Sequence, residues 1–105
     1  MKPILLFLTC ADNTEADIIS DSLLQKKLIA CAKKSTVTSK FNWDGKKDEG
    51  TEVLLIMDSV EELFEQIEVE ISQLHSYDTF VLIATPVIRT SSGIKEWFKK
   101  ELRAC

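Results

Sequence analysis

The sequence predicts an α+β domain with the ferredoxin-like order βαββαβ, followed by one additional C-terminal helix. Apolar residues alternate along the chain between short strand-like runs and segments of helical period. A hairpin signal lies near the middle of the chain, and 105 residues suffice for one domain, residues 1–105. The strands are expected to form an antiparallel sheet of order 4-1-3-2, with two helices on one face.

The first strand is expected over residues 4–10, a short apolar run. Asp12 is expected to be the N-cap of the first helix, because Glu15 three residues later completes a capping-box pattern. Apolar residues recur at helical spacing in the segment that follows, at Ala16, Ile19 and Leu23.

A period of two predicts the second strand over residues 29–43. One face of this strand carries Val37, Ser39, Phe41 and Trp43. The dipeptide Asp44-Gly45 predicts a hairpin turn within residues 44–50. Residues 51–58 are apolar enough to return as a central strand.

Ser59 is expected to cap the second helix, with Glu62 completing another capping box. The apolar positions of this helix fit one face: Val60, Leu63, Phe64, Ile67, Ile71 and Leu74. The segment over residues 79–88 predicts the fourth strand, ended by Pro86 or shortly after. A third helix is expected to begin near Ser91 or Ser92. That helix or a partner subunit is expected to cover the bare face of the sheet.

Composition excludes several classes of protein. A formal net charge of −4 without a basic patch argues against nucleic acid as a partner. No apolar run reaches the roughly 20 residues that span a bilayer, and no segment has the pattern of a signal peptide. The three cysteines show no CxxC pair, so neither a disulfide framework nor a zinc site is expected. Cys31 is expected to pack in the core, Cys105 to be an exposed thiol, and the protein to be cytoplasmic.

The predicted topology brings several polar residues to one edge of the sheet. The first and fourth strands are neighbours and antiparallel, so the end of one meets the start of the other. Cys10, Asp12, His75, Tyr77 and Asp78 are therefore expected to lie together, beside the start of the first helix. His75, the only histidine, is the natural metal ligand of this group, with Cys10, Asp12 and Asp78 as its candidate partners.

Five segments, in this order, resemble the CutA family of divalent-cation tolerance proteins: LIAC, VTSKFNWDGK, EVLLIMD, LHSYDT and TPVI. The similarity runs from Ile4 to about Leu102. Its most specific parts are TSKFNWDGK and the motif formed by His75, Tyr77 and Thr79.

The resemblance implies a homotrimer similar to the PII-type signalling proteins, with Phe41 and Trp43 in contacts between subunits. It also implies binding of copper(II) or another divalent cation at a cleft that includes His75 and is lined by Tyr77. No cofactor is required, and no catalytic reaction is expected. The alternative is a PII-like regulatory trimer that binds a small metabolite or a protein partner and has no metal role.

Other roles remain open for these residues. His75 can instead close the second helix, and Cys10 can be a buried apolar residue at a strand end. A Cys10–His75 pair could act as nucleophile and base, but nothing else in the sequence supports catalysis. The chain departs from the family pattern at Phe80 and Val81, where Pro-Glu is usual, so one carboxylate is missing. The usual Pro-Gly bulge of the second strand is also absent.

Overall fold

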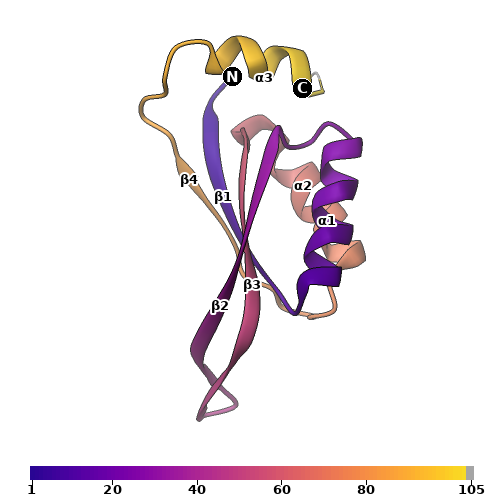
Figure 1. The fold of residues 1–105 in the computed structure, drawn as a ribbon, viewed down its shortest axis with the longest axis vertical. Coiled ribbons are helices and arrows are strands. Elements are labelled where there is room, and N and C mark those ends of the chain that lie inside the picture. Colours follow the sequence, from indigo (N-terminus) through magenta and orange to yellow (C-terminus); the bar gives the residue numbers. More distant parts are fainter. Residues whose placement is uncertain (104–105) are drawn as a thin grey trace.

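One antiparallel sheet with the strand order β2-β3-β1-β4 forms the centre of the molecule (Figure 1). The structure is a computed structural model that describes residues 1–103; Cys105, expected to be an exposed thiol, lies outside this range. The strands are β1 (Pro3–Cys10), β2 (Cys31–Trp43), β3 (Lys46–Val60) and β4 (Leu82–Pro86). This is the predicted order 4-1-3-2 counted from the other edge, so the predicted fold class is confirmed.

Three α-helices accompany the sheet within residues 1–103: α1 (Asn13–Gln25), α2 (Phe64–Leu74) and α3 (Ile94–Glu101). A 3-10 turn, η1 (Glu61–Leu63), leads into α2. Helices α1 and α2 cover one face of the sheet, whereas α3 lies across the end at which both termini are found (Figure 1). No helix in this part of the chain is both long and apolar enough to span a bilayer.

The core lies between the sheet and the pair α1 and α2. Side chains along β1 alternate strictly between buried and half-buried, as expected for a strand with one covered face. The covered face of the sheet contributes Ile4, Leu6, Leu8, Cys10, Val53, Leu55 and Met57, and the helices contribute Ala16, Ile19, Leu23, Ile67 and Ile71. Burial of these apolar side chains is the main stabilising contribution to the fold.

The opposite face of the sheet is apolar but only partly covered. Leu5 and Phe7 of β1 and Ile56 of β3 are half-buried, and Ile83 of β4 keeps 55% of its surface exposed. Register places Phe7 beside both Ile56 and Ile83, so these side chains form a continuous row. The third helix or a partner subunit was expected to cover this face. Helix α3 covers only one end of it.

Strands β2 and β3 continue past the helices as a two-stranded arm (Figure 1). The turn at its tip consists of Asp44 and Gly45 alone, with φ values of 52° and 74° that fit a type I′ hairpin. The predicted turn over residues 44–50 is therefore too long, because pairing with β2 carries β3 back to Lys46. The ladder runs without a bulge from Cys31 opposite Asp58 to Trp43 opposite Lys46.

The predicted capping box of the second helix is wrong. Ser59 lies in β3, because pairing with β1 continues as far as Pro3 opposite Val60. The buried Ser59 hydroxyl donates a hydrogen bond of 2.6 Å to the Leu28 carbonyl. The Glu62 carboxylate accepts a hydrogen bond from the Lys2 backbone N–H at 3.1 Å instead of capping the helix.

Three predicted boundaries also shift. β2 begins at Cys31 rather than at residue 29, since Ile29 is buried in the preceding loop. β4 begins at Leu82 rather than at residue 79, where pairing with β1 starts, and it ends at Pro86 as expected. Helix α3 begins at Ile94, after Gly93 with a φ of 91°, and not near residues 91–92.

Replacement of Gly45 by valine tests the turn at the tip of the arm. We expect Gly45→Val to lower the free energy of unfolding by about 1–2 kcal/mol, because a side chain is strained at positive φ. Gly50→Val is the matched control, since Gly50 lies in β3 with nothing within 4 Å of an added Cβ. Urea unfolding followed by circular dichroism measures both variants. Equal losses in the two variants would contradict the assigned turn.

Candidate functional site

The start of α1 is fixed by two side chains. Asp12 is the N-cap, as predicted, and its Oδ1 accepts a hydrogen bond from the Glu15 N–H at 2.8 Å. The Glu15 carboxylate reaches back, but to the Ala11 N–H at 2.9 Å rather than to the N–H of the cap residue. Its second oxygen accepts a hydrogen bond from the Ser76 N–H at 2.7 Å. Glu15 therefore joins the end of β1, the start of α1 and the segment that follows α2.

His75 closes α2, and its side chain turns back onto β1. The backbone N–H of His75 donates to the Ile71 carbonyl at 2.8 Å, and its side chain has no exposed surface. Ring atom Nε2 lies 2.8 Å from the Thr9 carbonyl oxygen, and Nδ1 accepts a hydrogen bond from the Tyr77 N–H at 3.1 Å. A carbonyl oxygen can only accept, so Nε2 carries the proton and Nδ1 the lone pair.

Aromatic side chains enclose the imidazole ring. Phe80 stacks on His75 with ring centroids 5.1 Å apart, and Tyr77 packs at 4.8 Å with a tilted ring. The Tyr77 hydroxyl donates to Glu52 Oε2 at 2.8 Å. Burial, together with the hydrogen bond and the negative charge of Glu52, raises the pKa of Tyr77 to about 12. Phe80 and Tyr77 therefore hold the ring of His75 in place.

Cys10 is the last residue of β1, and its side chain points into the core. The residue has no exposed surface. Burial raises the pKa of the Cys10 thiol to about 12, and the neighbouring carboxylates of Glu15 and Asp12 add to this effect. The thiol is therefore protonated near neutral pH and is not an activated nucleophile.

The Glu15 carboxylate, by contrast, is held in its charged form. Burial alone would raise its pKa, but the hydrogen bonds from Ala11 and Ser76 outweigh burial, so the pKa lies below the ordinary value. Glu15 Oε1 lies 3.5 Å from Nδ1 of His75. A charged oxygen and a nitrogen lone pair thus face each other inside the site.

Cys10, Glu15 and His75 form a cluster whose sulfur, oxygen and nitrogen atoms all lie within 4.8 Å of one another. Thiolate, carboxylate and imidazole are all metal-ligand types. Two candidate ligands inferred from the sequence, Asp12 and Asp78, do not belong to this cluster. Asp12 is used as the helix cap, and Asp78 is exposed on the loop after α2.

Glu15 is the cluster residue that sequence reasoning missed. Its position in the capping box predicted a backbone role and concealed its second role beside His75. The signal was nonetheless present, because any capping residue of the first helix lies at the edge where Cys10 and His75 were expected.

The cluster fits a divalent cation in its donor types and spacing but not in its hydrogen bonding. The 3.5 Å between Nδ1 of His75 and Oε1 of Glu15 is near the roughly 3 Å expected between adjacent ligands with bonds of about 2.1 Å. However, Nδ1 already accepts a hydrogen bond from Tyr77, and Oε1 accepts one from Ala11. A cation must therefore displace the Tyr77 N–H from the single lone pair of Nδ1, whereas it can share Oε1 with the Ala11 N–H.

Phe41 and Trp43, expected between subunits, lie on the arm. Trp43 keeps 67% of its surface exposed and Phe41 keeps 40%. By register they lie on the same face of the sheet as Phe7 and Ile56, the face that α1 and α2 leave bare. The apolar face of the sheet thus extends onto the arm.

Residues 4–101 match the family of the CutA1 divalent ion tolerance protein. The divalent-cation tolerance protein CutA of Archaeoglobus fulgidus is 35% identical over 92 residues, which cover 88% of this chain and 87% of that protein. The protein of the same name from Pyrococcus horikoshii is 30% identical over 100 residues, covering 95% of this chain and 98% of that one.

Solved structures show the same similarity in three dimensions. The Archaeoglobus fulgidus CutA structure superposes with a TM-score of 0.93 at 30% identity, covering 96% of this chain and 99% of that chain. CutA1 from Oryza sativa superposes with a TM-score of 0.95 at 25% identity, covering 100% and 97% of the two chains. The likeness therefore includes the arm and α3 as well as the core.

Replacement of Glu15 by glutamine tests the junction that its hydrogen bonds form between the end of β1, the start of α1 and the segment after α2. An amide has only one accepting oxygen, so glutamine cannot accept hydrogen bonds from both Ala11 and Ser76. We therefore expect Glu15→Gln to lower the free energy of unfolding by about 1–3 kcal/mol at pH 7. The pKa of Glu15 is lowered by folding, so its contribution is present above the ordinary value of 4.5 and is lost as the pH falls through the folded-state pKa. The difference from wild type should therefore shrink at acid pH.

Urea unfolding of chelator-treated protein at several pH values measures this dependence. Glu68→Gln, an equal change of charge at an exposed position on α2, is the control and should have little effect. A loss for Glu15→Gln that is constant with pH would contradict the assigned ionisation.

Proposed function

The chain belongs to the CutA1 divalent ion tolerance protein family, and we propose that it acts in divalent-cation tolerance as a noncatalytic homotrimer that binds a divalent cation weakly. The observation that carries the proposal is the convergence of an imidazole, a carboxylate and a thiol at the end of β1. Copper(II) suits the imidazole and the carboxylate of this set, because it favours imidazole nitrogen with additional nitrogen or oxygen ligands.

His75 and Glu15 are the ligands in this proposal. Nδ1 of His75 carries the lone pair, and the Glu15 carboxylate is already charged, so neither group must release a proton. Cys10 is the third donor, but its raised pKa means that metal binding must displace the thiol proton. The lost hydrogen bond and the buried thiol both lower the affinity, which supports weak and reversible binding.

The uncovered face of the sheet supports the trimer. Leu5, Phe7, Ile56 and Ile83 leave a continuous apolar surface partly open, and the arm extends it with Trp43. Apolar surface of this extent is typical of contacts between protein subunits. We propose that the arm of each subunit packs against its neighbours and that Phe41 and Trp43 lie in these contacts.

The same geometry supports the absence of catalysis. A Cys10–His75 pair would need an ionised thiol and a ring nitrogen free to take its proton. Burial keeps Cys10 protonated, and Nε2 of His75 is directed at the Thr9 carbonyl while Nδ1 is occupied by Tyr77. Neither member of the pair is placed to act.

One observation favours the alternative, a regulatory trimer that binds a small metabolite or a protein partner without a metal role. Both ring nitrogens of His75 are hydrogen-bonded within the chain. The histidine therefore has a complete structural role, as a link between α2 and β1, whether or not a cation binds.

Copper binding by single-residue variants separates the two proposals. We expect wild-type protein to take up copper(II) in proportion to its subunits and His75→Gln to lose this uptake, because the imidazole supplies the nitrogen ligand. Asp78→Asn, the matched control, should bind as wild type does, since Asp78 lies outside the cluster. Native mass spectrometry gives the stoichiometry, and nitrogen coupling in the electron paramagnetic resonance spectrum identifies the ligand. Undiminished copper binding by folded His75→Gln would refute the metal proposal.

Replacement of Trp43 on the arm by alanine tests the proposed trimer. We expect a trimer mass for wild type and, for Trp43→Ala, a subunit dissociation constant raised at least about tenfold, since buried tryptophans dominate subunit contacts. Val69→Ala is the control, because Val69 is similarly exposed, at 57%, but lies on α2 on the other side of the sheet. Sedimentation over a range of concentrations measures both. A wild-type monomer, or equal weakening by the two variants, would contradict the proposed assembly.

A further inference from the structure

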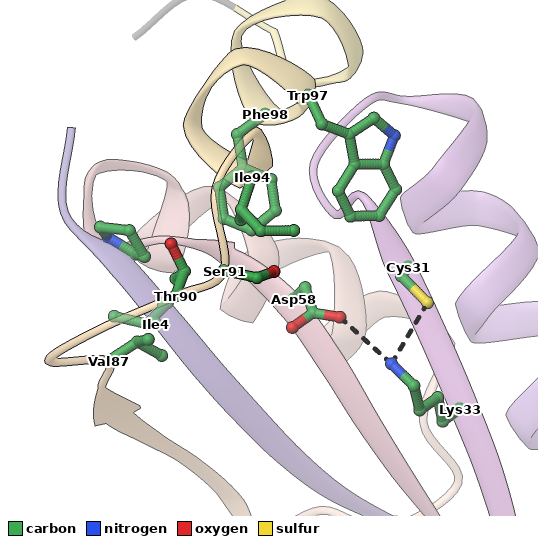
Figure 2. Close-up of a pocket in the computed structure, with 11 residues that line it drawn as sticks. Ile4, Cys31, Lys33, Asp58, Val87, Thr90, Ser91, Ile94, Trp97 and Phe98 are labelled. Carbon is green, nitrogen blue, oxygen red and sulfur yellow. Dashed lines mark hydrogen bonds and ion pairs between the residues drawn. The ribbon is translucent and has the colours of Figure 1, made fainter.

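A second site candidate lies at the opposite end of the sheet from the His75 cluster. A cavity of about 290 Å³ opens between α3 and the sheet, next to Ile4 at the start of β1 (Figure 2). Its apolar wall is formed by Ile94, Trp97 and Phe98 of α3. Because Cys10 ends β1 and Ile4 lies next to its start, the two sites are separated by nearly the length of β1.

The other wall of this cavity carries both signs of charge. Lys33 of β2 and Asp58 of β3 lie on the same face of the sheet, with Nζ and Oδ2 3.5 Å apart, and Nζ is 3.6 Å from Sγ of Cys31 (Figure 2). The ion pair is loose compared with the 2.7 Å between Lys26 and Glu70. An ammonium has three donors and a carboxylate about four acceptor positions, so both groups retain capacity for a ligand.

We propose that this cavity binds a free α-amino acid with an apolar side chain, such as leucine. The ligand carboxylate lies on Lys33, its ammonium lies on Asp58, and its side chain packs against Ile94, Trp97 and Phe98. A ligand of one charge would be attracted by one member of the ion pair and repelled by the other. A zwitterion satisfies both, and the aromatic and aliphatic wall selects an apolar side chain.

The size of the cavity supports a small ligand. Its volume lies near the lower end of the roughly 300–1,000 Å³ range of ligand sites, which also combine apolar walls with a few polar groups. The proposal does not depend on metal binding, because none of the cavity residues belongs to the cluster of Cys10, Glu15 and His75.

Protection of Cys31 from alkylation tests the proposal in the full chain in its native assembly. Cys31 lines the cavity and is half-buried, so a bound ligand should slow its reaction with iodoacetamide. The probes are leucine, isocaproate, which lacks the ammonium group, and isoamylamine, which lacks the carboxylate. Mass spectrometry of peptides measures Cys31 separately from the other cysteines. We expect leucine to protect Cys31. Either analogue should need about a tenfold higher concentration for the same protection, because each lacks one charge-assisted contact.

Variants of the ion pair provide the second measurement. Lys33→Met and Asp58→Asn should each raise the leucine concentration that gives half protection about tenfold. Lys34→Met is the matched control and should leave it unchanged, because Lys34 pairs with Asp17 on α1, on the other face of the sheet. Each variant is compared with its own rate without leucine, since Lys33 contacts the thiol. Absence of protection by leucine, equal protection by the analogues, or an equal shift with Lys34→Met would overturn the proposal.

Discussion

One half-buried carboxylate, that of Glu15, holds together the three elements that form the candidate metal site. It accepts hydrogen bonds from Ala11 just after β1 and from Ser76 after α2, and its own N–H, in the first turn of α1, is capped by Asp12. The N–H groups of Ala11 and Ser76 lie just beyond β1 and α2 and need partners outside these elements, because backbone donors are costly to bury unpaired. Glu15 satisfies two of them, and His75 packs against the junction that results.

The consequence for function is that metal binding and local structure compete. The same atoms that would hold a cation, Nδ1 of His75 and Oε1 of Glu15, are acceptors in the metal-free junction. A cation therefore gains the imidazole ligand only by displacing the Tyr77 N–H from Nδ1, and it must share Oε1 with the Ala11 N–H. Assembly has no such conflict, because the apolar face that includes Phe7 belongs to the sheet and the arm. The trimer can thus form without metal in this account.

Much of this arrangement could be predicted from the sequence, because it depends on local patterns. The strand order followed from the alternating elements, and the Asp12 cap followed from a short motif. What failed depended on partners distant in sequence. Ser59 has the pattern of a helix cap but is held in β3 by pairing with β1, and the polar residues after Gly45 form a strand because β2 lies beside them. Glu15 became a candidate ligand only once α2 was placed against β1.

The state of the imidazole ring in metal-free protein tests this account most directly. His75 is the only histidine, so a nitrogen-15 NMR spectrum that correlates ring protons with ring nitrogens reports this site alone. The account predicts a single tautomer near neutral pH, with the proton on Nε2 and a lone pair on Nδ1, because Nε2 faces the Thr9 carbonyl and Nδ1 faces the Tyr77 N–H. A proton on Nδ1, or rapid averaging between tautomers, would show that the ring is not held in the junction and would contradict the account.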